Sequence, residues 1–137
     1  MLSNSRVQRP LVSLIVLSLI VRPCLGQQPL NVTCNTAGLA QDCSGFVTTF
    51  CSSIGTDLIA QEDTVSRCFT TSSATKCDLA VWNTLTGSNT PSVQNCETAL
   101  ARVAAICAMG GSGIFVGAPF KFFLQEDTGA CGPPFAS

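Results

Sequence analysis

The sequence contains no histidine and no tyrosine, and its only tryptophan is Trp82. Histidine is the commonest general base in enzymes and the base in most Ser–His and Cys–His catalytic pairs. Its absence excludes those pairs and also the side chain that usually titrates near neutral pH. We therefore expect a protein that is not an enzyme.

Clustered basic residues are also missing. Beyond residue 26 the chain has four basic and eight acidic residues, which gives a net charge of −4. Proteins that bind nucleic acids or anionic lipid surfaces carry Lys and Arg in patches or runs. We therefore expect no nucleic-acid partner.

Long hydrophobic runs are absent apart from one, LVSLIVLSLIV at residues 11–21. It follows the basic residues Arg6 and Arg9 and precedes the small-residue stretch CLG at 24–26. This order is typical of a secretory signal peptide, and the run is too short to span a bilayer.

The N-terminal segment 1–26 is therefore predicted to be a signal peptide that is removed, with Gln27 as the new N-terminus. The alternative is a lipid anchor at Cys24, but the preceding VRP lacks the small residues that such a site needs. The remaining residues, 27–137, have the length of one domain. We expect this domain to be secreted and extracellular, without membrane insertion.

Eight cysteines remain after residue 26, and an even number in a small secreted domain indicates four disulfides. Metal binding is the alternative reading. However, the chain has no histidine and no C-x₂-C pair, so we expect neither a metal site nor a cofactor. The eight are Cys34, Cys43, Cys51, Cys68, Cys77, Cys96, Cys107 and Cys131.

Two segments have apolar residues at helical spacing. The first predicted helix runs from Cys43 to Ile54, with Asp42 as its N-cap and Gly55 at its end. The second is capped by Thr90, has a proline at its first position, and ends at the Gly110–Gly111 pair.

Each predicted helix carries two cysteines that are too far apart to bond to each other. Eight residues separate the first pair and eleven the second, which places them about 12 and 16 Å apart along the helix axis. A disulfide needs Cα atoms within about 7 Å. The natural partners are the strand and terminal cysteines Cys34, Cys68, Cys77 and Cys131, and the sequence does not choose among these pairings.

The remaining segments are rich in β-forming residues. We predict a strand at 29–34, a hairpin of 64–70 with 76–83, and one or two strands at 113–125 with a break near 117–119. Apolar residues on both faces of the last segment predict a sheet that is covered on both sides.

The tetrapeptide QEDT occurs twice, at 61–64 and 125–128. The second copy continues as Asp-Thr-Gly, which is how an aspartic protease motif reads, but too few residues follow Asp127 to build such a lobe. We interpret both copies as solvated turns beside a disulfide. The alternative is a calcium site that unites the two acidic pairs.

Several motifs together resemble the small cysteine-rich glycan-binding lectins of mushrooms, whose type member comes from the shaggy ink cap. The resemblance covers about residues 30–132. The motifs are SRCF at 66–69, KCDLAVWNT at 76–84, TPSVQNCETAL at 90–100, GGSG at 110–113 and DTGACG at 127–132.

This resemblance implies a fold and an activity. The fold is a disulfide-rich single-domain α/β/α sandwich of the α+β kind, in which helices flank a small antiparallel sheet. The activity is binding, without catalysis, of N-acetylhexosamine- and fucose-bearing glycans of the LacdiNAc type by a secreted fungal lectin. The resemblance further implies a homodimer joined through its sheet edges.

Sugar sites generally pair an aromatic ring with planar polar groups, and one stretch of the hairpin offers both. Trp82 supplies the ring, while Asp78, Asn83 and Thr84 supply hydrogen-bonding groups. These four are the candidate glycan-binding residues. The interpretation that we favour for Trp82 itself is nevertheless that it packs beneath a helix with its N–H satisfied.

Two further expectations follow from the sequence. The sequon NVT at 31–33 predicts N-glycosylation of Asn31. A second functional hypothesis is a secreted disulfide-rich effector or inhibitor that contacts a protein target with the same scaffold.

Overall fold

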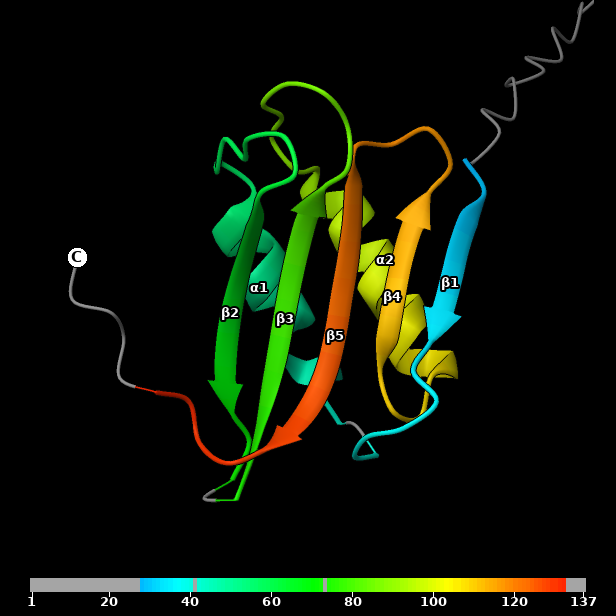
Figure 1. Ribbon diagram of the computed structural model, residues 1–137. Helices are drawn as coiled ribbons and strands as arrows, with labels where there is room; N and C mark the ends of the chain where they lie inside the picture. The colour runs from blue at the N-terminus through cyan, green and yellow to red at the C-terminus, as the bar shows by residue number, and fades with distance from the viewer. Residues whose placement is uncertain (1–27, 41, 73, 133–137) are drawn as a thin grey trace, which may run out of the picture.

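The computed structural model describes residues 28–40, 42–72 and 74–132, so the predicted signal peptide lies outside the described residues. Figure 1 shows a five-stranded sheet with helices behind it. The elements are β1 (Leu30–Cys34), η1, a 3₁₀ helix (Ser44–Phe46), α1 (Val47–Ile54), β2 (Thr64–Thr70), β3 (Thr75–Asn83), α2 (Val93–Ile106), β4 (Gly111–Phe115) and β5 (Phe120–Thr128).

The sheet has the strand order β1-β4-β5-β3-β2, and every neighbouring pair is antiparallel. The two longest strands, β3 and β5, pair along their whole length at the centre of the sheet. β1 and β2 form its two edges. The predicted strands are thus confirmed, including the break that separates β4 from β5.

The predicted fold class, a disulfide-rich α+β domain with a small antiparallel sheet and flanking helices, is confirmed. One part of the sandwich description changes, because both α-helices lie on the same face of the sheet (Figure 1). The described residues therefore form two layers. The other face carries charged side chains such as Lys76, Asp78 and Lys121, which need access to water.

Strict alternation along β3 and β5 explains which face meets the helices. In β3, Cys77, Leu79 and Val81 are buried, whereas the residues between them are half-buried. In β5 the buried apolar positions include Phe122 and Leu124. Because successive strand residues point to opposite faces, these side chains form one floor beneath the helices.

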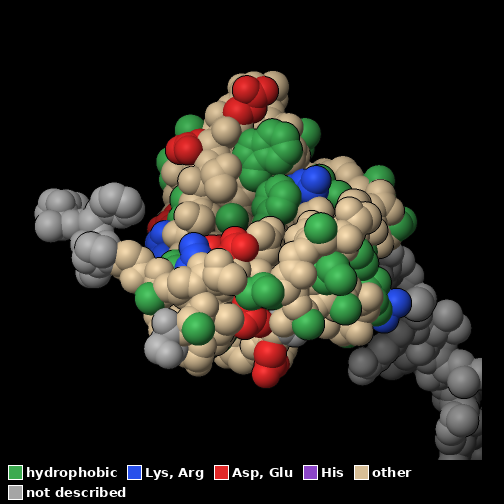
Figure 2. Space-filling model, turned by 60° about the horizontal axis from the view of Figure 1, so that its bottom comes forward, with side chains coloured by type: hydrophobic (Ala, Val, Ile, Leu, Met, Phe, Trp, Pro, Cys, Tyr) green, Lys and Arg blue, Asp and Glu red, His purple; other side chains and the backbone are tan. Residues whose placement is uncertain are grey.

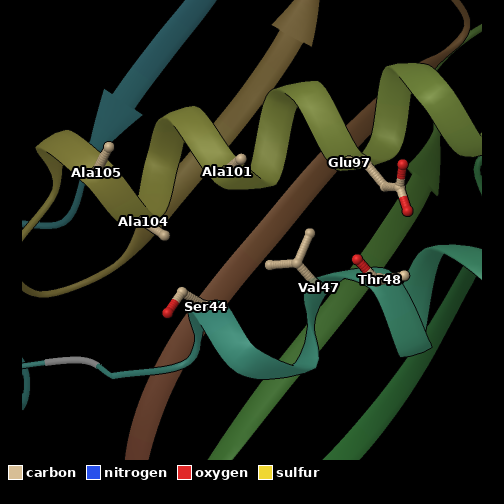
Figure 3. Close-up of a pocket in the computed structure, with 7 residues that line it drawn as sticks. All are labelled: Ser44, Val47, Thr48, Glu97, Ala101, Ala104 and Ala105. Atoms are coloured by element: carbon tan, nitrogen blue, oxygen red, sulfur yellow. The ribbon is translucent and has the colours of Figure 1, made fainter.

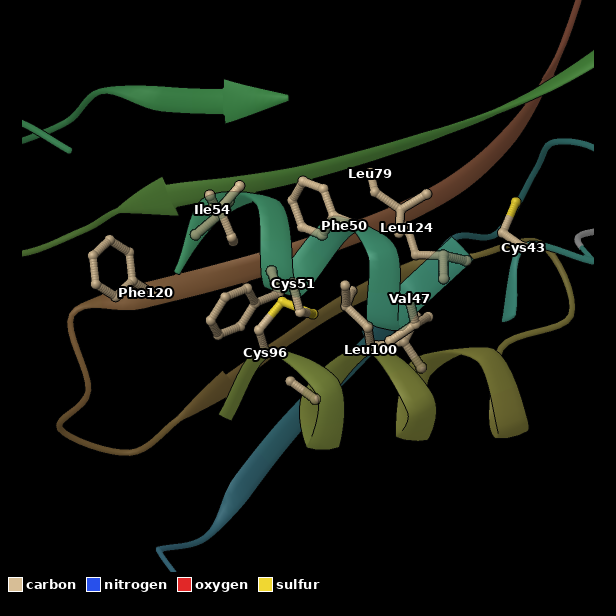
Figure 4. Close-up of a cluster of buried hydrophobic side chains, with 14 of the residues drawn as sticks. Cys43, Val47, Phe50, Cys51, Ile54, Leu79, Cys96, Leu100, Phe120 and Leu124 are labelled. Carbon is tan, nitrogen blue, oxygen red and sulfur yellow. A yellow bond between two sulfur atoms is a disulfide. The ribbon is translucent and has the colours of Figure 1, made fainter. Parts of the chain in front are cut away.

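The core lies between this floor and the two helices (Figure 4). Phe50 and Ile54 of α1, and Leu100 and Val103 of α2, are fully buried in it. α2 packs closely over β4, and the glycine at 113 makes this possible. A Cβ at Gly113 would lie only 3.2 Å from the Cβ of Ala99. Neither α-helix of the described chain is long and apolar enough to cross a membrane.

Four disulfides tie this arrangement together, as the cysteine count predicted. As the spacing also predicted, neither helix bonds internally. The expected partners are correct for Cys43 and Cys107 but wrong for the two other helical cysteines, which bond to each other and join α1 to α2. The bonds are Cys34–Cys107, Cys43–Cys77, Cys51–Cys96 and Cys68–Cys131.

The predicted helix starts are displaced. The first helix opens as the 3₁₀ turn η1, whose N-cap is Cys43 rather than Asp42 and has no side-chain cap hydrogen bond. The backbone N–H of Asp42 donates to Glu126 Oε2 at 2.9 Å. α2 is capped by Ser92, whose hydroxyl accepts from the N–H of Asn95 at 3.3 Å, rather than by Thr90. The end at Gly55 is confirmed, whereas α2 ends at Ile106, before the predicted glycine pair.

Candidate functional site

The face of the sheet that carries no helix of the described residues is called here the open face. Residues in register across it form rows that run from one edge strand to the other. One row joins Thr64 of β2, Trp82 of β3, Lys121 of β5, Ile114 of β4 and Asn31 of β1. Because these residues alternate with core residues along their strands, all of them point away from the helices.

Trp82 therefore does not pack beneath a helix. It is half-buried on the open face, directly opposite Lys121 and diagonal to Phe123. Diagonal neighbours in an antiparallel pair lie about 7–8 Å apart, which is within reach of aromatic side chains. The interpretation that placed the tryptophan in the core is wrong.

Around Trp82 the open face is apolar with one cation at its centre. We call this set the aromatic patch, and its members are all half-buried. The Nζ atom of Lys121 lies 5.1 Å from the ring centroid of Phe123, a cation–π distance. In Figure 2, where the open face is tilted upward, hydrophobic side chains lie beside a basic one. The patch consists of Ala80, Trp82, Ile114, Lys121 and Phe123.

Asp78 shares the open face with Trp82 but lies four residues away along β3, about 13 Å. Its carboxylate forms an ion pair of 2.7 Å with Lys76. The hydrogen bond to Asp78 raises the pKa of Lys76, and the charges of Asp78 and Asp127 raise it further against an opposing desolvation effect. Asp78 thus sits at the margin of the aromatic patch with a charged partner already in place.

Asn83 is fully buried on the opposite face from Trp82. Its Nδ2 atom donates to the carbonyl oxygens of Ile59 and Gly87, at 3.0 and 2.9 Å. Its Oδ1 atom accepts from the N–H of Leu85 at 3.2 Å. Two of these bonds fix the loop that follows β3, and the bond to Ile59 ties Asn83 to the segment before β2. The structure therefore makes Asn83 a loop-holding residue and does not bring it together with Trp82.

Thr84 begins the loop that follows β3 and is half-buried. Its backbone N–H and its hydroxyl both donate to the carbonyl oxygen of Pro119, at 2.7 and 3.0 Å. These bonds tie the loop at 84–90 to the turn between β4 and β5. Thr84 is therefore held beside the end of the strand that carries Trp82.

The two acidic tetrapeptides lie at opposite ends of the sheet. The first forms the turn before β2, where the N–H of Asn83 donates to the carbonyl oxygen of Asp63. The second lies within β5, where Asp127 is in register with Lys76 and Glu126 is buried. The calcium site that would unite them is therefore wrong, and the second copy is a strand rather than a turn.

Among the described residues, one cluster has ligand atoms close enough to hold a metal ion, formed by Cys43, Cys77 and Glu126. The two cysteines are bonded to each other in a disulfide. A disulfide sulfur is not the thiolate that metals require. The Glu126 carboxylate has a partner as well, because it accepts the Asp42 N–H.

A groove of about 460 Å³ runs between the two helices on the far side of the core (Figure 3). In Figure 3 the side chain of Glu97 on α2 and that of Thr48 on α1 are at one end. The rest of the lining is mostly alanine and valine, with few donors for a sugar hydroxyl. Its lining residues are Ser44, Val47, Thr48, Glu97, Ala101, Ala104 and Ala105.

A second groove, of about 410 Å³, lies where β1 meets the first turns of α2. It combines amide side chains with the edge of Phe115, whose ring is almost fully buried. The Thr98 hydroxyl in this groove already donates to the carbonyl oxygen of Gln94 at 2.8 Å. The lining residues are Gln28, Leu30, Gln94, Asn95, Thr98 and Phe115.

Sequence reasoning missed four members of the aromatic patch: Ala80, Ile114, Lys121 and Phe123. The sequence did contain a signal for two of them, because Lys121 and Phe123 alternate with the core-facing apolar residues of the predicted strand. This alternation did not point to an exposed site, because both faces of that strand were expected to be covered.

Comparison with known families gives this geometry a context. No curated protein matches the chain. The family model described as glycan binding domain Y3 matches residues 42–131, which is more than half of the sequence and includes β2 to β5 and both α-helices. The chain therefore belongs to the Y3 family of glycan-binding domains.

Proposed function

We propose that this protein is a secreted, non-catalytic lectin that binds glycans on the open face of its sheet, at the aromatic patch. The observation that carries this proposal is the position of Trp82, the only tryptophan of the chain, on the face of the sheet away from both described α-helices. A tryptophan that served only the core would lie on the other side of β3.

The aromatic patch has the chemistry that a pyranose ring needs. The ring faces of Trp82 and Phe123 offer apolar surface to the C–H face of a sugar. The Lys121 ammonium between them can donate up to three hydrogen bonds to hydroxyl or carbonyl oxygens. Asp78, at the margin of the patch, accepts hydrogen bonds from hydroxyl groups and extends the site beyond one sugar unit.

The proposed sugar class rests on how well an acetamido group suits the patch and on the resemblance to the mushroom lectins. An N-acetylhexosamine carries a methyl group that suits an aromatic ring and a carbonyl oxygen that suits a donor such as Lys121. We propose N-acetylhexosamine- and fucose-bearing glycans of the LacdiNAc type as ligands. Secretion is supported by the four disulfides, which persist in oxidising compartments.

We also propose that the protein forms a homodimer through its sheet edges. Each of the two edge strands, β1 and β2, has a sheet neighbour on one side only. Such a strand presents unpaired backbone N–H and C=O groups that a second copy can bind. Analytical ultracentrifugation of residues 27–137 measures this directly, and a single monomeric species at tens of micromolar contradicts it.

A glycan array with residues 27–137, produced by a secretory route with intact disulfides, tests the proposed function. Trp82→Ala and Phe123→Ala are tested beside the wild type, after circular dichroism has shown that each one folds. Ile106→Ala is the matched control, since this apolar side chain is 49% exposed but lies on α2, outside the sheet. We expect binding to a few N-acetylhexosamine or fucose-bearing glycans, loss in both patch variants, and no change in the control.

Two other outcomes are informative. Binding that survives both patch variants means that the glycan site lies elsewhere, and Gln94→Ala in the groove beside α2 is then the variant to examine. A blank array from folded protein contradicts the lectin function and favours the alternative, an effector or inhibitor that contacts a protein target.

A further inference from the structure

The sequon Asn31-Val-Thr33 lies on β1, and its two functional side chains point to the open face. Asn31 is in register with Ile114 and Thr33 with Ser112, both on the side of β4 that faces away from the helices. Asn31 and Thr33 are both exposed. The acceptor nitrogen of the sequon therefore lies on the same face as the aromatic patch.

The separation between Asn31 and Trp82 is short on the scale of an N-linked glycan. The two residues belong to the same row, with Ile114 and Lys121 between them. Three strand spacings separate their backbones, which amounts to roughly 14 Å. The two residues between them are half-buried, and both α-helices lie behind the sheet, so neither covers this path.

From this placement we propose that Asn31 carries an N-linked glycan that lies across the open face and competes with external glycans for the aromatic patch. This inference rests on the proposed function. The modification is the transfer of an oligosaccharide from a lipid diphosphate donor. The Nδ2 atom of Asn31 loses a proton and bonds to C1 of the first sugar, while the C1–O bond to the diphosphate breaks and the lipid diphosphate leaves.

The chemistry of the attached chain matches the proposed site. An N-linked glycan begins with two N-acetylglucosamine units, which are N-acetylhexosamines, and continues into mannose branches. The second unit and the sugars that follow it extend far enough from Asn31 to reach the patch. The attached glycan thus presents sugars of the proposed ligand class from β1, two strands away from β5, which bears Lys121.

The expected size of the effect follows from tethering. A ligand on a short flexible tether has an effective concentration in the millimolar range. If the tethered sugars bind the patch with a Kd of about 0.1 mM, an effective concentration of about 1 mM weakens an external ligand roughly tenfold. Removal of the glycan should therefore raise the affinity for an external ligand roughly tenfold.

The experiment uses residues 27–137 secreted from a eukaryotic host, in four forms. The wild type and Thr33→Ser keep the sequon, whereas Asn31→Gln and Thr33→Ala remove it through two different residues. Mass spectrometry measures the occupancy of Asn31. Calorimetry measures the affinity for N,N′-diacetylchitobiose and for the glycans that the array identifies.

We expect an occupied Asn31 in the two sequon-bearing forms and roughly tenfold tighter binding by the other two. Trp82→Ala added to Asn31→Gln should abolish this gain. An unmodified Asn31, or equal affinity in all four forms, overturns the inference and leaves the proposed function intact. Absence of binding in every form, including folded Asn31→Gln, contradicts the proposed function and this inference with it.

Discussion

Trp82 and Lys121 lie directly opposite each other on β3 and β5, on the face of the sheet away from both described α-helices. The same lysine has its ammonium group 5.1 Å from the ring centroid of Phe123. One cation thus lies over the ring of Phe123 and in register with a second aromatic residue on the neighbouring strand. This relationship gives the open face a defined apolar centre instead of a scattered set of exposed side chains.

The charge of Lys121 should matter more for glycan binding than for folding. Lys121→Met keeps the apolar stem but removes the cation, and an exposed cation–π contact is worth about 0.5–1 kcal/mol. We expect the free energy of unfolding, measured in urea, to fall by no more than about 1 kcal/mol. Glycan affinity in the array should fall clearly. A large loss of stability with unchanged binding would contradict both expectations.

Asn83 should prove important for stability although it belongs to the candidate binding stretch. Asn83→Ala removes three hydrogen bonds: those to the carbonyl oxygens of Ile59 and Gly87, which keep Asn89 as a donor, and the one from the Leu85 N–H. A typical hydrogen bond contributes about 0.5–1.5 kcal/mol, so we expect a loss of at least about 2 kcal/mol in urea unfolding. Ser88→Ala, an exposed change in the same loop, is the control. Equal stability of the two variants would show that the buried amide does not hold the loop.

The sequence was sufficient for much of the fold because its signals were local. Alternation gave the strands, helical spacing gave both helices, and the cysteine count gave four disulfides. Which face of the sheet the helices cover, by contrast, depends on long-range packing. Because Phe123 is apolar and lies in a strand, the sequence suggests that it faces a covering layer. In the structure it is half-buried on the open face, in register with half-buried Ala80.

The candidate site was only partly predictable for the same reason. Asp78 and Trp82 do share a face, as alternation requires, but Asn83 follows Trp82 by one residue and so points into the core. The neighbours of Trp82 on β5 and β4 depend on strand order and register, which are long-range properties. The pairing of Cys51 with Cys96 likewise depends on how α1 and α2 pack, which neither helix sequence states.

The Cys51–Cys96 disulfide, which joins the two helices, should stabilise the fold more than the Cys68–Cys131 disulfide does. Cys51 and Cys96 are fully buried between α1 and α2, whereas Cys68 is exposed and binds Cys131 near the end of the described chain. Loss of a native disulfide typically costs 2–5 kcal/mol, and a buried pair also leaves a cavity. We expect the double alanine variant at 51 and 96 to lose more free energy of unfolding than the one at 68 and 131.

That comparison separates two physical effects. The sequence separation is 63 residues for the exposed pair and 45 for the buried pair. Chain entropy alone therefore predicts a slightly larger loss at 68 and 131. Chemical denaturation of both double variants shows whether core packing or chain entropy makes the larger contribution. A larger loss of free energy of unfolding for the variant at 68 and 131 would show that core packing around Cys51 contributes little.

Glycan binding should be insensitive to pH near neutrality. The chain has no histidine, the side chain whose ordinary pKa lies between about pH 5 and 8. We expect calorimetric affinities to agree within about twofold between about pH 6 and 8. A larger change would contradict this expectation.

Gly110 should be far less tolerant of substitution than Gly117, although both have positive φ, at 73° and 79°. A Cβ at Gly110 would lie 2.3 Å from the carbonyl oxygen of Leu124, whereas at Gly117 it would meet nothing within 4 Å. Both alanine variants share a left-handed backbone cost of about 1–2 kcal/mol. Only Gly110→Ala must also displace β5, which adds about 1–3 kcal/mol by analogy with overpacking. Thermal unfolding of the two variants measures this difference, and equal transition temperatures would show that β5 yields without cost at Leu124.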